Sequence, residues 1–125
     1  IATDHAPHDI TDKQVQYQNA CFGIVGLETA LPLSLKLVDE KILSMSDTIR
    51  KLTATPAQIF NLDAGNLSIG KEADVLIFNP DIKYSIDVSK FHSKSKNSPF
   101  DGWKVKGKVF HTLARGKIVY TDPDL

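Results

Sequence analysis

Apolar residues in the first half of the chain recur at the spacing of an α-helix. They are separated by four, four, three and four positions, which places them on one face of a helix. The stripe consists of Leu27, Leu31, Leu35, Val38 and Ile42. Pro32 interrupts it, because proline lacks the N–H that a helix interior needs. We therefore expect either a kink at Pro32 or a helix whose regular part begins near it.

Two shorter helices are expected after this stripe. Ser46 can cap the first, since a serine side chain accepts hydrogen bonds from the free N–H groups of a helix start. Thr55 followed by Pro56 predicts the start of the second, with proline in its first turn. This second helix is expected to bury Ile59 and Phe60.

The second half has the pattern of strands and turns. Asn79-Pro80 predicts a turn that ends the first strand, and the polar, serine-rich residues 90–99 predict a loop. A hairpin is expected around Ala114-Arg115-Gly116. The expected strands are 73–78, a weak one at 83–86, and the hairpin pair 105–113 and 117–120. The change in character near residues 61–66 predicts two units, 1–62 and 63–125.

Charge and cysteine content narrow the class of protein. Fifteen basic residues balance fifteen acidic ones, which argues against nucleic-acid or membrane-surface binding driven by net charge. Cys21 is the only cysteine, so no internal disulfide forms and a reducing cytoplasm is the expected compartment. The apolar runs are too short to span a bilayer, and the first residues lack the pattern of a signal peptide.

The segment Thr3-Asp4-His5-Ala6-Pro7-His8-Asp9 carries the main candidates for chemistry. Pro7 excludes a regular helix, so the segment is expected to be a strand end that runs into a loop, where barrel enzymes hold their active sites. Asp4 can bind a divalent metal through one oxygen and accept a proton from water through the other. The alternative is that Asp4 only caps a turn. His8 can bind an anionic substrate or a metal, or simply be a solvated loop residue.

Two further features concern ligands. Phe22-Gly23 together with Gly26 precede the expected helix, and glycines there would let backbone N–H groups approach a ligand closely. A tight turn before the helix is the alternative. Asp4, His5 and His8 do not by themselves make a good zinc site, because a catalytic zinc needs three protein ligands and adjacent residues point apart.

Combined, these segments resemble the C-terminal part of the dihydroorotases of the longer bacterial type, in the metal-dependent amidohydrolase superfamily. The discriminating strings are Thr3-Asp4-His5-Ala6-Pro7-His8 and Cys21-Phe22-Gly23-Ile24-Val25-Gly26-Leu27-Glu28-Thr29. Less specific agreement comes from Thr53-Ala54-Thr55-Pro56-Ala57, Gly70-Lys71-Glu72-Ala73-Asp74-Val75 and Lys96-Asn97-Ser98-Pro99-Phe100. The resemblance extends over essentially the whole chain.

The resemblance implies an α/β fold: the end of a TIM barrel, with its last strand and helices, followed by part of a small β-sandwich. It implies interconversion of N-carbamoyl-L-aspartate and L-dihydroorotate in pyrimidine synthesis, with one or two zinc ions. Asp4 matches a zinc ligand that is also the general base, and His8 matches a histidine on the substrate's carboxylate side. Phe22 and Gly23 match a backbone stretch that contacts substrate, whereas His5 matches no ligand.

The family's other metal ligands and its substrate arginine lie upstream of the matching region. We therefore expect the 125 residues to be the tail of a longer protein, inactive alone and without tightly bound zinc. Another cyclic amidase, such as a hydantoinase or allantoinase, is one alternative. A non-catalytic, dihydroorotase-like structural subunit is another, and a complete binding module is the third. The expected partner is a small-molecule substrate, with no nucleic acid and no membrane, and a homo-oligomer is left open.

Overall fold

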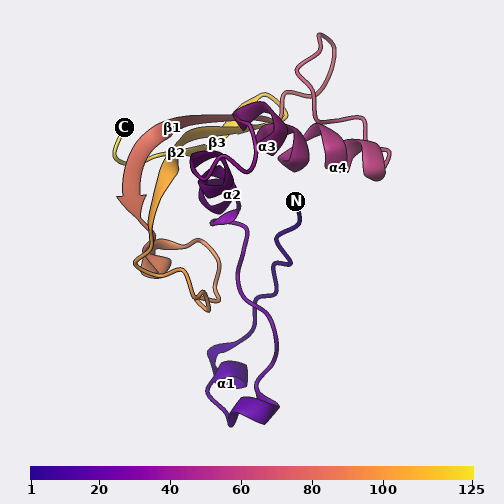
Figure 1. Cartoon of the computed structure of the whole chain (residues 1–125). Coiled ribbons are helices and arrows are strands. Elements are labelled where there is room, and N and C mark those ends of the chain that lie inside the picture. The colour runs from indigo at the N-terminus through magenta and orange to yellow at the C-terminus, as the bar shows by residue number, and fades with distance from the viewer.

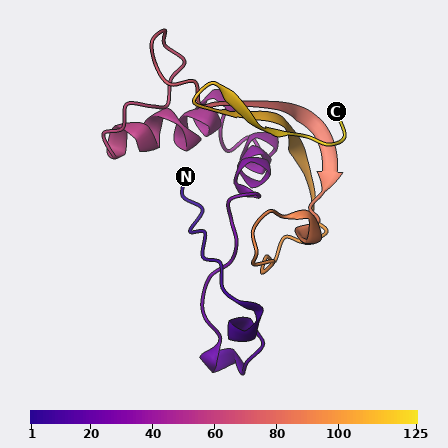
Figure 2. The same cartoon turned by 180° about the vertical axis from the view of Figure 1, so that it is seen from behind.

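The computed structural model describes all 125 residues, in which α2 packs on one small sheet and α3 and α4 follow beside it (Figure 1). The first 29 residues contain only short helical turns and run out from this body as a long loop, seen from both sides in Figures 1 and 2. The helices are α1 (Ile10–Lys13), α2 (Ala30–Asp39), α3 (Met45–Leu52) and α4 (Ala54–Ile59), with 3₁₀ turns η1 (Tyr17–Asn19) and η2 (Val88–Lys90). The strands are β1 (Val75–Ser85), β2 (Lys104–Ala114) and β3 (Lys117–Thr121).

Helix α2 starts at Ala30, so Pro32 lies in its first turn, where the missing N–H is not needed. Of the two expectations for Pro32, the helix start is the correct one. The apolar stripe is longer than the helix, however. Leu27 precedes α2 and Ile42 follows it, and both side chains are 62% exposed. Leu35, in the middle of the stripe, is only 3% exposed and is the residue that docks the helix.

The caps of the next two helices differ from those expected. Ser44, not Ser46, caps α3: its hydroxyl accepts from Asp47 N–H at 3.0 Å and donates to the Asp47 carboxylate at 2.7 Å. The Ser44 hydroxyl thus satisfies one of the free N–H groups of the helix start, and the Asp47 carboxylate accepts its own proton. Helix α4 begins at Ala54, one residue before Thr55.

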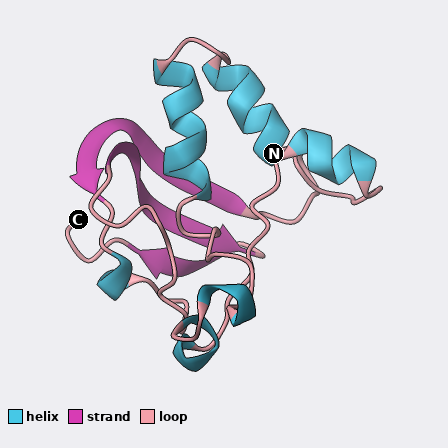
Figure 3. Cartoon of the chain, turned by 60° about the horizontal axis from the view of Figure 1, so that its bottom comes forward, coloured by secondary structure: helices cyan, strands magenta, loops and turns pink.

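Burial of Ile59 and Phe60 by α4 was a wrong prediction for this chain. The two side chains are 71% and 72% exposed. Only Ala57 of this six-residue helix is buried, because α4 contacts α3 and no sheet covers its other side, as Figure 3 shows.

The sheet is antiparallel, in the order β1-β2-β3, with β2 in the centre. The predicted hairpin is confirmed. Ala114 pairs with Lys117, and the two residues between them, Arg115 and Gly116, have φ angles of +50° and +75°. Positive φ at both central positions is the signature of the type I′ turn, whose twist matches that of the paired strands.

Strand β1 does not end at Asn79-Pro80, and the prediction of two separate strands there was wrong. The ladder shifts register between Asn79 and Lys83, whose partners are Lys108 and Lys106. Residues 80–82 therefore face a single residue of β2, which makes a bulge. A bulge on an edge strand tolerates proline, since no N–H is required at that point. The strand bends strongly along its length, as Figure 1 shows.

The chain contains helices and one small sheet, in keeping with the expected α/β class. It contains no second sheet and no closed barrel. The segment expected to be the last barrel strand makes one isolated parallel bridge, between His5 and Ile24. None of the helices has the length and apolar character needed to cross a membrane.

Contact between α2 and β2 holds the helices on the sheet. Gly107 has a φ of +98°, and a Cβ built on it would lie 2.2 Å from Leu35 Cδ1. The leucine side chain therefore occupies the space above a residue that must be glycine. Together with buried Val105 and Ile86, this contact forms the centre of a core in which only 12 of the 125 residues are buried. A core of that size makes each buried contact important for stability.

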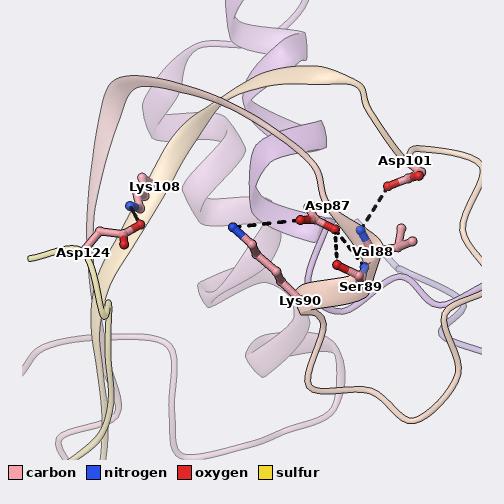
Figure 4. A network of polar contacts seen from close by, with 7 residues as sticks. All are labelled: Asp87, Val88, Ser89, Lys90, Asp101, Lys108 and Asp124. Atoms are coloured by element: carbon pink, nitrogen blue, oxygen red, sulfur yellow. Dashed lines mark hydrogen bonds and ion pairs between the residues drawn. The ribbon is translucent and has the colours of Figure 1, made fainter.

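Ion pairs between Lys108 of β2 and two aspartates that follow β3 hold the C-terminal residues against the sheet. The Lys108 ammonium lies 2.8 Å from the Asp122 carboxylate. It lies 3.0 Å from the carboxylate of Asp124 (Figure 4). Asp122 is 4% exposed, and its N–H donates to Phe110 O at 2.8 Å. Burial opposes ionisation of Asp122, but hydrogen bonds from Lys108 and from Asp124 N–H outweigh it and lower its pKa. The same pairing raises the pKa of Lys108.

Replacing Gly107→Ala should destabilise the chain by about 2–4 kcal/mol, through the clash with Leu35 and the left-handed backbone. Gly116→Ala is the matched control, because Gly116 also has positive φ but nothing lies within 4 Å of its built Cβ. It should cost only about 1 kcal/mol. Urea unfolding followed by circular dichroism measures both. Equal losses in the two variants would contradict the packing role of Gly107.

Asp122→Asn should cost about 1–3 kcal/mol at neutral pH, where the wild-type carboxylate accepts charge-assisted hydrogen bonds. Because the folded-state pKa of Asp122 is lowered, this stability is present above the ordinary aspartate pKa. It disappears as the pH falls through the folded-state value, so the two proteins should converge in acid. Asp124→Asn, at a side chain 77% exposed, should lose less than about 1 kcal/mol. Unfolding curves across the acid range test this; a pH-independent difference would refute it.

Candidate functional site

The two segments that carry the candidate residues lie side by side. Ala6 N–H donates to Ile24 O at 2.9 Å. A Cβ on Gly23, whose φ is +107°, would lie 2.4 Å from Ala6 Cβ, and one on Gly26 would lie 2.8 Å from Thr3 O. Only glycine permits so close an approach of the two backbones. The structure thus brings the Asp4–His8 segment together with Phe22-Gly23.

Asp4 is held in an unusual conformation with its side chain free. Its φ is +47°, in the left-handed region that non-glycine residues seldom adopt. The side chain is exposed, and it makes no hydrogen bond or ion pair with another residue. The alternative interpretation of Asp4 as a turn cap therefore has no support in the contacts. Backbone strain of this kind is concentrated at functional sites.

Asp4 does not form a metal site with other residues of this chain. The one group of three side chains with ligand atoms close enough for a common metal is His8, Asp12 and Cys21, which excludes Asp4. A catalytic zinc takes at least three protein ligands. The residues present around Asp4 can supply one ligand and do not by themselves fit a zinc ion.

His5 connects the two segments through a hydrogen bond, a role that the motif alone did not predict. Its Nδ1 accepts a hydrogen bond from Gly26 N–H at 3.0 Å. This contact, together with the isolated bridge between His5 and Ile24, ties the two segments to each other. His5 therefore positions its neighbours.

The backbone around Phe22 and Gly23 combines two N–H groups without a partner and an anchored carbonyl. The Phe22 side chain is 92% exposed, and neither N–H donates to another residue of the chain. The Gly23 carbonyl, by contrast, receives two donors: Lys13 Nζ at 2.7 Å and Asn97 Nδ2 at 2.9 Å. The anchored carbonyl restrains this backbone, and its two N–H groups remain available to an acceptor from outside the chain.

Asn97 and Glu28 are two residues whose roles sequence reasoning missed. Asn97 also accepts from Val25 N–H, at 2.9 Å, through its backbone carbonyl. The Glu28 carboxylate accepts from His92 N–H at 2.9 Å and from Ser93 N–H at 3.1 Å. Both residues lie in the quoted motif strings, but contacts separated by more than 60 positions leave no periodic signal in a sequence. They hold the loop after β1 against the candidate site.

That loop is shaped at its base by two aspartates (Figure 4). Asp87 accepts from Ser89 Oγ at 2.5 Å and from Ser89 N–H at 3.0 Å, which lowers its pKa. Asp101 accepts from Val88 N–H at 3.1 Å. These contacts cap the η2 turn and join the two ends of the loop, so Asn97 is presented on a closed, hydrogen-bonded segment.

Comparison with known proteins agrees with the motif and the fold. Residues 1–119 match the family model described as the amidohydrolase family. The chain therefore belongs to the amidohydrolase family. Among curated relatives, it is 49% identical over 122 residues to a dihydroorotase of Syntrophus aciditrophicus, which covers 98% of this chain and 29% of that protein. It is 52% identical over 120 residues to a dihydroorotase of Anaplasma phagocytophilum, covering 96% and 27%.

A solved structure shares the fold. The L-hydantoinase (dihydropyrimidinase) from Arthrobacter aurescens superimposes with a TM-score of 0.85 at 36% identity, over 94% of this chain and 28% of that protein. The chain spans less than a third of the length of each of these proteins. The arrangement of α2, the sheet and the N-terminal loop is therefore that of a segment within larger amidohydrolases.

Asn97→Asp should loosen the candidate site, because a carboxylate oxygen would replace the amide donor that faces the Gly23 carbonyl. Loss of a hydrogen bond worth about 1 kcal/mol corresponds to a roughly fivefold loss of hydrogen-exchange protection at Val25 N–H. Asn66→Asp is the control in an exposed loop, since its amide nitrogen makes only a 3.5 Å contact with Ala64 O and an aspartate keeps the oxygen that accepts from Ser68 N–H. Unchanged exchange at Val25 in the Asn97 variant would show that the side chain does not position this backbone.

Proposed function

We propose that this chain is part of a dihydroorotase, which interconverts N-carbamoyl-L-aspartate and L-dihydroorotate in pyrimidine synthesis. The observation that carries the proposal is identity of about half of all positions with dihydroorotases, over 96–98% of the chain. The motif that discriminates dihydroorotases from related cyclic amidases lies inside this match. Activity, substrate and partners of the complete protein are part of this proposal.

A hydantoinase is the second candidate, favoured by the shared fold with the Arthrobacter enzyme. Identity to that enzyme is 36%, lower than the 49% and 52% to the two dihydroorotases. An imidazole at His8 suits an acidic substrate better than a neutral one, because it can hydrogen-bond a carboxylate. Dihydroorotate carries a carboxylate, whereas an unsubstituted hydantoin has none.

In the proposed site the Asp4 carboxylate transfers a proton from the attacking water to the leaving ring nitrogen. In hydrolysis, water adds to the ring carbonyl while the Asp4 carboxylate accepts its proton. The amide C–N bond then breaks, and the same proton passes from Asp4 to the leaving ring nitrogen, which yields N-carbamoyl-L-aspartate. The absence of any hydrogen-bond partner for Asp4 supports this role, since nothing competes for its oxygens. His8 and the Phe22 and Gly23 N–H groups would hold the substrate.

A divalent metal, zinc in the proposed enzyme, would supply Lewis-acid activation of the attacking water and of the ring carbonyl. Asp4 would provide one of its ligands, and the others would have to come from outside these 125 residues. In the complete protein we assign residues 1–62 to the end of the barrel and residues 63–125 to part of a β-sandwich. A cytoplasmic enzyme, with no nucleic-acid or membrane partner, is consistent with the single free cysteine. A homo-oligomer is left open.

Two substitutions in the complete protein should give separable kinetic effects. Asp4→Asn should lower kcat by roughly 10²–10⁴-fold, because the proton carrier acts in the transition state. His8→Ala should mainly raise the KM for dihydroorotate, by about tenfold, through the lost charge-assisted hydrogen bond. His111→Ala is the control, since its imidazole contacts Thr121 on the sheet, and it should behave like the wild type.

Colorimetric detection of N-carbamoyl-L-aspartate measures these rates. Turnover of hydantoin without turnover of dihydroorotate would favour the hydantoinase, and turnover of neither would favour a structural homologue. A near-normal kcat in the Asp4→Asn variant would overturn the assignment of the proton carrier.

A further inference from the structure

A second group of ligand-type side chains lies in the protruding N-terminal loop. An imidazole nitrogen of His8, a carboxylate oxygen of Asp12 and the Sγ of Cys21 all lie within 4.8 Å of one another. Asp12 and Cys21 are exposed and His8 is partly buried. Four and nine positions separate these residues along the chain, so the sequence shows no metal-binding spacing that includes all three.

The backbone of the loop, rather than a ligand, places the three side chains. Asp9 caps α1 by accepting from Thr11 N–H at 2.9 Å, which sets the direction of the turn between His8 and Asp12. Cys21 N–H donates to Asp12 O at 3.3 Å. Lys13 Nζ donates to the carbonyls of Cys21 and Gly23. The loop is thus closed on itself before any ion binds, which reduces the entropy cost of assembling a site.

The chemistry of the three side chains selects a class of ion. A thiolate and an imidazole favour borderline or soft divalent ions such as zinc and cadmium over magnesium or calcium, which prefer oxygen. Three ligands leave one position of a tetrahedral ion open to solvent, so the affinity is that of an open site and below that of a closed four-ligand one.

We propose that His8, Asp12 and Cys21 form a site for one zinc-like divalent cation, separate from the metal site to which Asp4 would contribute. The proposal stands on the geometry of this chain and does not depend on the proposed enzymatic function. A bound cation would engage the His8 imidazole, so this use of His8 competes with the substrate contact proposed for it. The expectation that the chain lacks tightly bound zinc rests on the ligands expected upstream and concerns the metal site of Asp4, whereas this group is a different one.

Cobalt(II) is the probe, and the purified 125-residue chain is the sample. Because Cys21 is the only cysteine, a sulfur-to-cobalt charge-transfer band reports on this site alone. We expect a saturable band with one cobalt per chain, intense d–d bands typical of four-coordination, and displacement of the cobalt by zinc. His8→Ala and Asp12→Asn should each weaken binding by about tenfold or more, the size of effect seen when even the hydrogen-bond partners of a metal ligand are lost.

Two control variants should bind cobalt like the wild type. Asp4→Asn tests whether the site is separate from the candidate active site, and His92→Ala removes an exposed histidine from another loop. Far-ultraviolet circular dichroism establishes that each variant retains the wild-type fold. No charge-transfer band in the wild type, or a band of unchanged affinity in both the His8 and Asp12 variants, would overturn the proposal. The second result would show that cobalt binds the cysteine alone.

Discussion

Docking of α2 on the sheet is the contact on which the rest of the arrangement depends. Leu35 fills the space above Gly107, and a Cβ on that glycine would clash with the leucine side chain. Once α2 is in place, Glu28, just before its first turn, lies where its carboxylate can accept from His92 and Ser93 N–H. A packing contact in the core thereby determines where a loop from the second half of the chain meets the first.

The candidate site forms where the loop after β1 contacts the N-terminal segments. The loop after β1 presents Asn97 to Gly23, and the close approach of Gly23 to Ala6 brings the Asp4–His8 segment to the same place. Elements from both halves of the chain thus hold a backbone whose N–H groups stay free. Membership of the amidohydrolase family agrees with this design, in which loops carry the chemistry and a packed body positions them.

Local features of the fold were predictable, and features that depend on distant partners were not. The β2–β3 hairpin follows from two neighbouring turn residues, and the start of α2 follows from Pro32, whose missing N–H acts on its own helix. The bulge at Pro80 depends on how β2 pairs with β1. The exposure of Ile59 and Phe60 depends on which surfaces are present to cover them. Neither the bulge nor this exposure can be predicted from the spacing of apolar residues along the sequence.

The sequence by itself determined the family and the candidate residues, because the Asp-His-Ala-Pro-His and Phe-Gly strings are contiguous and their chemistry is readable residue by residue. Only the tertiary structure decided which of those residues meet. It gave His5 a positioning role, left Asp4 without a partner, and grouped His8 with Asp12 and Cys21. The physical reason is that hydrogen bonds and metal coordination act over a few ångströms in space, and separation along the chain does not specify distances of that size.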